Sequence, residues 1–295
     1  MYEFILLNPS NLSLFDLFLH EKVRRSITEL SSRYRLIGSG AVHQGIPVGI
    51  CVGILNLDIH FFEFLHIEVN SEHQNRGIGR TLIAKTQEEA IKQQAKFFSF
   101  IYPNNDPDTP AIKKILNANK WEGSRSFMIK AWFDLEIFDA PILHLNLRYP
   151  PGYKDFFWKD LKESQRNDLL FREKQGHFSK AISPINDEDL IEPLNSLGLQ
   201  RDERVVGWLI TQRIDPETIR YASLYIEPSL KFRALAMKLL ADSILFHKYS
   251  PIKKAVLEIP YLQVSPSWVK FIQRRILPFA VKITYLQQAW HTEDF

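Results

Sequence analysis

One stretch of this 295-residue chain, residues 61–91, constrains the fold more than any other because it reads as a strand, a short polar loop and a helix. The strand is strongly apolar and closes at Val69, and the loop holds Gly77 and Gly79. The start of a helix exposes backbone N–H groups that have no intrahelical partner, and it carries partial positive charge. Glycines let successive N–H groups converge on one anion. The stretch therefore predicts a turn that binds phosphate or diphosphate.

The loop differs in spacing from the two common phosphate-binding motifs. A P-loop needs Lys followed by Ser or Thr after its second glycine, and here Arg80 and Thr81 follow Gly79. The dinucleotide-binding fingerprint needs three glycines, whereas this loop has two. The segment Gln74-Asn75-Arg76-Gly77-Ile78-Gly79 instead resembles the cofactor loop of the GNAT superfamily, the acyl-CoA-dependent N-acyltransferases. That family's pattern is Gln or Arg, two residues, Gly, one residue, then Gly or Ala. The alternative is a turn whose glycines serve packing only.

The resemblance implies a co-substrate, acetyl-CoA, and an amine acceptor that is a small molecule or a peptide. The diphosphate would bind the backbone amides of the loop, and the pantetheine arm would follow the strand that precedes it. A backbone N–H of that strand would polarise the thioester carbonyl. The cofactor-binding residues implied are Ile67, Val69, Gln74, Asn75, Arg76, Gly77, Ile78, Gly79, Arg80, Thr81 and Asn105.

Glu63 is the candidate catalytic base. A base is needed because an aliphatic ammonium, with a pKa of about 10.4, must lose a proton before it attacks. Several GNAT enzymes carry their catalytic glutamate at this position, six residues before the strand ends. Strand alternation predicts that Glu63 shares a face with Leu65, Ile67 and Val69, where desolvation raises the pKa of a carboxyl group. A bulge near the strand end, which GNAT strands often have, would change this alternation. An ion pair with a neighbouring arginine explains Glu63 equally well, and His66 and Glu68, on the opposite face, are alternatives.

The general acid has no standard candidate in this sequence. The family's usual tyrosine position corresponds to Leu116, counted back from Trp121. Tyr102, at the end of the preceding predicted strand, is the substitute, although a tyrosine of the core explains it too. Turn chemistry alone also explains Asn105. No metal site is predicted, because no histidine and acidic residue have metal-ligand spacing on one helix face.

The order of predicted elements extends the resemblance beyond the loop. Up to Leu135 the chain reads strand, helix, three strands, helix, strand, helix, strand, which is the order of a GNAT domain. A linker candidate at residues 149–152 and a polar helix predicted over residues 155–173 follow, and the second half then repeats the order in outline. The predicted fold class is α/β, with tandem GNAT-like mixed-sheet domains over residues 1–148 and 149–295.

The second predicted domain lacks the glycine loop. Aligning Ile226 with Val69 puts residues 231–236, Lys-Phe-Arg-Ala-Leu-Ala, over the loop, with alanine at both glycine positions. An alanine disfavours positive φ and keeps a ligand away from the backbone. The second half is therefore predicted to be a degenerate GNAT-like domain that serves as structure or as a wall of the acceptor cleft. An unrelated α/β domain is the alternative.

Composition narrows the classes of function. A net charge of +3 without a long basic run gives no reason to expect nucleic acid as a partner. Cys51 is the single cysteine and lies in an apolar run, which excludes an internal disulfide and predicts a buried thiol. Glu3 and the absence of a basic leader predict a first strand rather than a signal peptide, and no apolar run suffices for a membrane span. A cytoplasmic N-acetyltransferase is expected, with a CoA-binding pseudoenzyme or a protein-interaction scaffold as the alternatives.

Overall fold

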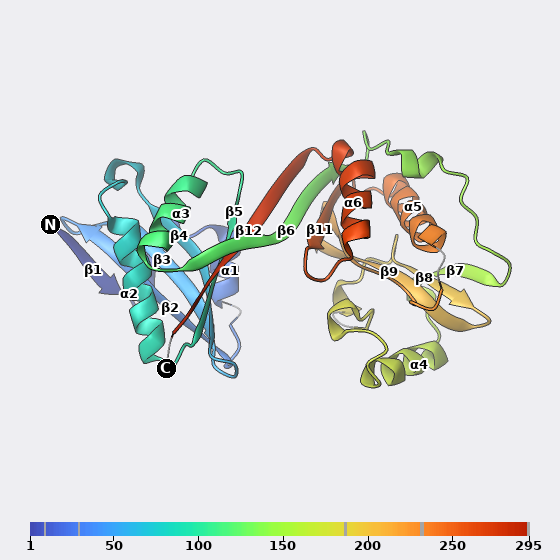
Figure 1. Cartoon of the computed structure of the whole chain (residues 1–295), viewed down its shortest axis with the longest axis horizontal. Coiled ribbons are helices and arrows are strands. Elements are labelled where there is room, and N and C mark those ends of the chain that lie inside the picture. Colours follow the sequence, from blue (N-terminus) through green and yellow to red (C-terminus); the bar gives the residue numbers. More distant parts are fainter. Residues whose placement is uncertain (9, 29, 186–187, 231–232, 294–295) are drawn as a thin grey trace. The chain divides into compact units, whose positions relative to one another are not determined.

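The structure is a computed structural model that describes residues 1–8, 10–28, 30–185, 188–230 and 233–293. Its chain forms two compact units (Figure 1). Unit 1 is Met1–Phe127 with Tyr285–Phe295, and unit 2 is Met128–Thr284. This division differs from the predicted boundary at residues 148/149, because residues 128–148 belong to unit 2 and the last strand returns to unit 1.

Unit 1 contains a mixed sheet in which the strands follow the order β1-β2-β3-β4-β5-β12. Neighbours are antiparallel except β4 and β5, which are parallel. The strands are β1 (Tyr2–Leu6), β2 (Tyr34–His43), β3 (Ile46–Asn56), β4 (Phe61–Val69), β5 (Phe97–Pro103) and β12 (Lys282–Thr292). β4 ends at Val69 as the sequence predicts.

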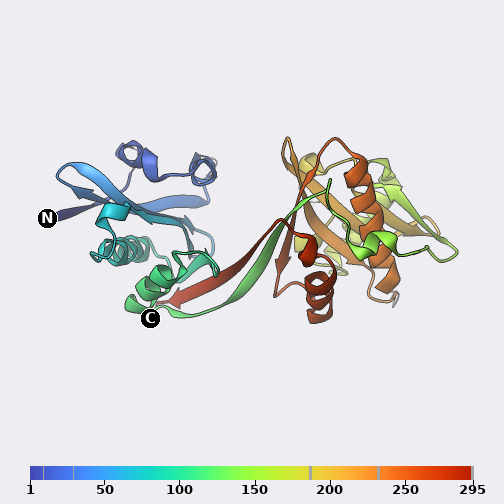
Figure 2. The same cartoon turned by 90° about the horizontal axis from the view of Figure 1, so that it is seen from above.

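Helices cover both faces of this sheet. Figure 2 shows η1 (Leu12–Phe18) and α1 (Glu21–Thr28) on one face, with α2 (Ile78–Lys92) and α3 (Thr109–Ala118) on the other. Phe15 and Phe18 pack against β3 on the η1 side, whereas the larger core lies on the α2 side. This coverage explains the run of buried residues along β3, because a strand covered on both faces needs no alternation of polar and apolar residues.

Unit 2 repeats this plan, with the strand order β7-β8-β9-β10-β11-β6 and one parallel pair, β10 with β11. Its strands are β7 (Tyr153–Phe157), β8 (Leu197–Arg201), β9 (Arg204–Asp215), β10 (Thr218–Ile226), β11 (Lys254–Pro260) and the later part of β6 (Glu122–Asp134). Its longer helices are α4 (Glu163–Lys174), α5 (Arg233–Tyr249) and α6 (Pro266–Arg275). None of the helices in the described residues is long and apolar enough to cross a bilayer.

The region after the linker candidate differs from the sequence-based prediction. The helix predicted over residues 155–173 begins only at Glu163, and residues 153–157 form β7 instead. The partner strand β8 was not predicted, because it is short and contains Gly198. A Cβ on Gly198 would lie 2.1 Å from Cζ of Phe156, so this glycine makes room for a ring of the neighbouring strand.

The two strands that close the units come from opposite halves of the sequence. β12, at the end of the chain, pairs with β5 over Leu286–Thr292 and places Ala289 in the core of unit 1. β6, from the first half, pairs with β11 over Met128–Asp134 and places Ile129 and Phe133 in the core of unit 2. The halves have therefore exchanged their last strands, which explains why neither unit is continuous with one half of the sequence.

Cys51 is fully buried on β3, which confirms the prediction of a buried thiol. Desolvation raises the pKa of this thiol to about 12, against a smaller opposing effect of a hydrogen bond with Thr86. A thiol that stays protonated is a poor nucleophile, so Cys51 is a packing residue.

Candidate acyl-CoA site

The loop between β4 and α2 turns on two residues with positive φ. Asn75 has a φ of 59°, and Gly77, the N-cap of α2, has a φ of 81°. A Cβ on Gly77 would meet no atom within 4 Å, so packing does not explain this glycine. A Cβ on Gly79 would lie 2.9 Å from Cδ1 of Ile115, so Gly79 lets α2 approach α3 closely. Gly77 therefore serves the backbone conformation and Gly79 the packing.

Most backbone N–H groups of this loop make no hydrogen bond to another described residue. Among the described residues, the N–H groups of residues 75–80 donate to no protein acceptor, whereas the Thr81 N–H donates to the Gly77 carbonyl at 3.1 Å. Two side chains hold the turn: Gln74 donates to the Val69 carbonyl at 3.0 Å, and Arg76 donates to the Tyr2 hydroxyl at 3.0 Å. The start of α2 thus presents unpaired donors and the positive end of the helix dipole, which suits an anion.

The strands β4 and β5 are paired over only part of their length and separate towards the glycine loop. Their parallel ladder joins Phe61–Phe64 to Phe97–Phe100 and then stops. β4 continues to Val69 and β5 to Pro103, so residues 65–69 and 101–103 face each other without a ladder. Backbone groups along a parted pair of strands are available to an extended ligand.

A bulge in β4 changes which side chains share a face. The register with β3 pairs His66 with Val52 and Phe64 with Gly53, so Leu65 is the extra residue. Phe62 and Phe64 lie in the core under α2, and so does Ile67. The partners of Glu63, His66 and Glu68 in β3 are Ile54, Val52 and Ile50, which alternate onto the η1 face.

The predicted alternation of β4 was therefore wrong beyond Phe64. Glu63 shares the η1 face with His66 and Glu68, and it does not share a face with Ile67 and Val69. The cause is the single inserted residue, because one extra residue reverses the direction of every side chain that follows it.

The comparisons with known proteins agree with this geometry. Residues 8–116 match the family model described as "Acetyltransferase (GNAT) family". This segment begins just after β1, ends in α3 and includes the glycine loop. Residues 8–116 have the fold of a GNAT domain.

The solved structures extend the likeness of fold to the whole chain. A tandem GNAT protein from the clavulanic acid biosynthesis pathway is 14% identical, with 98% of each chain covered and a TM-score of 0.66. A GCN5-related N-acetyltransferase from Sphaerobacter thermophilus is 11% identical, with 100% of this chain and 97% of that chain covered and a TM-score of 0.65. At such identities the likeness concerns the fold alone, which is a tandem GNAT fold. No curated protein matches the sequence.

The candidate catalytic residues of the GNAT domain lie on different sides of its sheet. Glu63 is half-buried on β4 and faces η1. Tyr102 is 2% exposed and packs near Phe100 in the core under α2, the side on which Leu116 is buried as well. Asn105 is exposed in the turn after β5. The GNAT fold thus brings the loop residues and the strand end together, but it does not bring Glu63 and Tyr102 onto one face.

In unit 2, the two parallel strands separate in the same way. β10 and β11 are joined over Thr218–Tyr221 and Lys254–Leu257, and β10 has its own register shift between Tyr221 and Ser223. Ile226 ends β10 as Val69 ends β4, which agrees with the alignment made from the sequence. Arg220 takes the place of Glu63, so the candidate base has no counterpart in unit 2.

The predicted degenerate loop is described only in part. Lys231 and Phe232 lie outside the described residues, and α5 begins at Arg233. Directly after β10, the Glu227 carboxylate accepts hydrogen bonds from Arg204 at 2.7 and 2.9 Å. The same arginine holds the pKa of Glu227 below its usual range, so a negative charge stands at the end of this strand.

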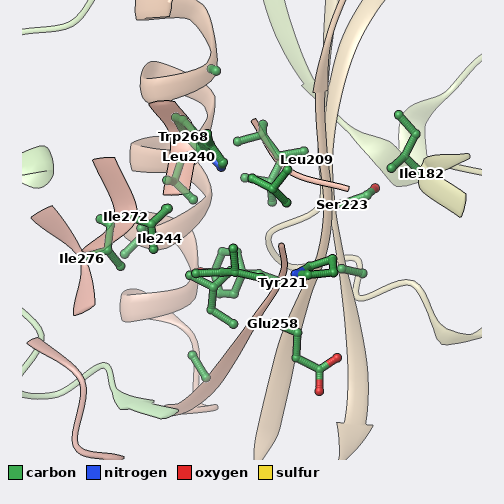
Figure 3. A pocket seen from close by; sticks show the side chains of 18 of the residues that line it. Ile182, Leu209, Tyr221, Ser223, Leu240, Ile244, Glu258, Trp268, Ile272 and Ile276 are labelled. Atoms are coloured by element: carbon green, nitrogen blue, oxygen red, sulfur yellow. The ribbon is translucent and has the colours of Figure 1, made fainter. Parts of the chain in front are cut away.

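A cavity of about 370 Å³ lies where β10 and β11 part. Its lining is mainly aliphatic and aromatic, and Figure 3 shows Trp268 and Leu240 on one side of the strands and Ile182 on the other. Tyr221 reaches it from β10, with its hydroxyl 3.2 Å from Nδ1 of His247. Sequence reasoning missed this cavity, because it inferred a ligand site only from the glycine loop. The repeated strand order was the signal that could have located it.

Proposed function

We propose that the chain is an N-acetyltransferase whose N-terminal GNAT domain moves an acetyl group from acetyl-CoA to a primary amine of a small molecule or peptide. The observation that carries this proposal is the combination of unpaired amides at residues 75–80 with the parting of β4 from β5 at the adjacent strand end. The first feature suits a diphosphate, and the second suits the extended arm of pantetheine. A packing role for the glycines alone explains neither.

The reaction is a direct attack in a ternary complex. The neutral amine forms a bond to the thioester carbonyl carbon, and the C–S bond breaks when the tetrahedral intermediate collapses. A backbone N–H of β4 near Ile67 stabilises the oxyanion. Glu63 accepts the proton that the amine nitrogen loses. The thiolate of CoA takes up a proton, for which Tyr102 is the candidate donor.

Thiol release with a panel of amines tests the activity. In the full chain, Glu63→Gln lowers kcat by about 100-fold or more, because a general base contributes a factor of this order. The affinity for acetyl-CoA, measured by calorimetry, stays the same. An unchanged rate across the pH range removes Glu63 from the role.

Tyr102→Phe separates a proton donor from a core residue. A tenfold or larger loss of turnover at constant stability supports the donor role, because the substitution removes only the hydroxyl group. Wild-type turnover with the phenylalanine assigns Tyr102 to the core, and water or the protonated nitrogen of the tetrahedral intermediate then supplies the proton to the thiolate.

A second candidate function rests on the cavity of unit 2. Its apolar lining and parted strands favour a bound ligand in a unit that lacks a counterpart of Glu63, which is the pattern of a binding domain rather than an enzyme. Thermal shifts with CoA esters in a Gly77→Trp variant test this candidate. A shift that survives in this variant belongs to unit 2, and no shift in either protein favours an interaction scaffold.

A further inference from the structure

Three side chains with metal-binding atoms converge on the η1 face of unit 1. His66 and Glu68 are two residues apart on β4 and therefore point the same way, and His20 lies between η1 and α1. Nε2 of His66 is 3.2 Å from Oε2 of Glu68, and Nε2 of His20 is 3.7 Å from the same oxygen. One ligand atom from each residue lies within 4.8 Å of the others.

The positions of these residues are fixed by the packing around them. The bulge at Leu65 turns His66 and Glu68 towards η1. Phe15 and Phe18 anchor η1 in the core on this face, and the short segment after Phe18 brings His20 over β4. The imidazole rings of His20 and His66 meet edge to face, with centroids 5.2 Å apart.

We propose that His20, His66 and Glu68 bind one divalent transition-metal ion of the Zn²⁺ class. Two imidazole nitrogens and one carboxylate oxygen are ligands that Zn²⁺ and Co²⁺ accept. Tetrahedral bonds of about 2.0–2.1 Å separate ligand atoms by about 3.3–3.4 Å, and the two observed distances lie on either side of this value.

The ion would have three protein ligands and an open coordination position. His20 is 73% exposed and His66 14%, so the site is closed towards the sheet and open towards solvent. The sequence did not indicate it, because metal-ligand spacing is recognisable along one helix face, and this cluster combines a strand with a loop. Metal binding here does not depend on acyl transfer, although the cluster shares the η1 face of β4 with Glu63.

Titration of the full chain with Zn²⁺ and Co²⁺ tests the proposal, using protein without a polyhistidine tag that has been freed of metal with a chelator. Wild type is expected to bind one equivalent in calorimetry, and Co²⁺ is expected to show ligand-field absorption at the same stoichiometry. His66→Ala and Glu68→Gln are each expected to weaken binding about 100-fold or more, since even loss of an outer contact costs 10–100-fold. His20→Ala, on an exposed segment, keeps the test valid if the strand variants fail to fold.

The matched control is another histidine–carboxylate pair of this chain. Nε2 of His144 lies 2.7 Å from Oδ1 of Asp139, and these two residues belong to no three-ligand group among the described residues. His144→Ala is expected to leave the affinity and the Co²⁺ spectrum unchanged. Absence of stoichiometric binding, or equal binding by wild type and the His20→Ala variant, overturns the proposal.

Discussion

Gly77 shows how one residue links the backbone to the proposed ligand site. Its φ of 81° lies in the left-handed region, and the space beside its Cα is open. Gly45, in the turn between β2 and β3, has a φ of 79° and equally open surroundings, but it lies at a hairpin and not at a helix start. The two glycines therefore carry the same conformational constraint, but only Gly77 lies at the start of a helix.

Replacing these glycines separates strain from binding. Gly77→Trp and Gly45→Trp are each expected to cost about 1–2 kcal/mol, or a fall in Tm of about 2–8 °C, because a side chain is unfavourable at positive φ. Only Gly77→Trp is expected to lower acetyl-CoA affinity by about 100-fold or more, since its ring occupies the space in front of the amides. Differential scanning fluorimetry and calorimetry measure the two effects, and equal affinity in the two variants contradicts the loop assignment.

The burial of His247 leads us to expect that the stability of unit 2 depends on pH. It is fully buried, its Nε2 has no partner among the described residues, and burial together with Lys253 and Arg213 lowers its pKa to about 4. The unfolded chain therefore binds a proton more readily than the folded chain, so stability falls as the pH falls from about 6.5 to about 4.

Urea unfolding at pH 7.5 and pH 4.5 measures this contribution. Wild type is expected to lose about 3 kcal/mol more than His247→Gln over this range, because the shift of the pKa corresponds to a free energy of that order. Tyr221→Phe, which removes the hydrogen bond to Nδ1 but keeps the imidazole, is expected to retain the dependence. The same loss in His247→Gln contradicts the assignment.

Among the elements, β4 agrees with the sequence-based prediction in its bounds but not in the faces of its side chains. Its bounds, its parallel pairing with β5 and the loop that follows it were predictable, because apolar runs, glycine positions and the order of elements are read from the sequence. The face of Glu63 was not predictable, since the inserted Leu65 is decided by the register with β3. The cluster of His20 with Glu68 was hidden for the same reason, because packing of η1 brings the two together across 48 positions.

Substitutions at two strand glycines test the bulged register between β3 and β4. A Cβ on Gly53 would lie 2.4 Å from Cζ of Phe62 and 2.5 Å from the Glu63 carbonyl oxygen, whereas a Cβ on Gly123 in β6 would meet nothing within 4 Å. Gly53→Ala is expected to destabilise unit 1 by about 1–3 kcal/mol through overpacking and to weaken acetyl-CoA binding through displacement of β4. Gly123→Ala is expected to be neutral or to stabilise by up to about 1 kcal/mol. Urea unfolding compares them, and equal stabilities contradict the assigned register.

At the scale of the whole molecule, the exchange of last strands makes each unit depend on both halves of the sequence. The repeat of strand order and the likeness of the halves were predictable, but the exchange was not. β6 and β12 have similar apolar patterns, and only the pairing of β12 with β5 and of β6 with β11 decides where each belongs. A boundary drawn at the proline-rich stretch before β7 therefore cuts unit 2 away from one of its own strands.

Removing the last strand tests this dependence. Deleting residues 285–295 from the full chain is expected to abolish acetyl-CoA binding although every loop residue remains, because β5 loses its partner and Ala289 leaves the core. Addition of a peptide of residues 282–293 is expected to restore part of the binding. Calorimetry follows both steps, and wild-type affinity in the truncated chain contradicts the exchange.

The proposed acyl transfer requires that the unpaired amides after β4 hold the diphosphate of acetyl-CoA. Amide hydrogen exchange of the full chain, followed by mass spectrometry with and without acetyl-CoA, tests this contact. We expect slower exchange in peptides that cover residues 65–81 when acetyl-CoA is bound. Unchanged exchange in these peptides at saturating acetyl-CoA, or slowing confined to residues 218–226 and 254–260 of unit 2, contradicts it.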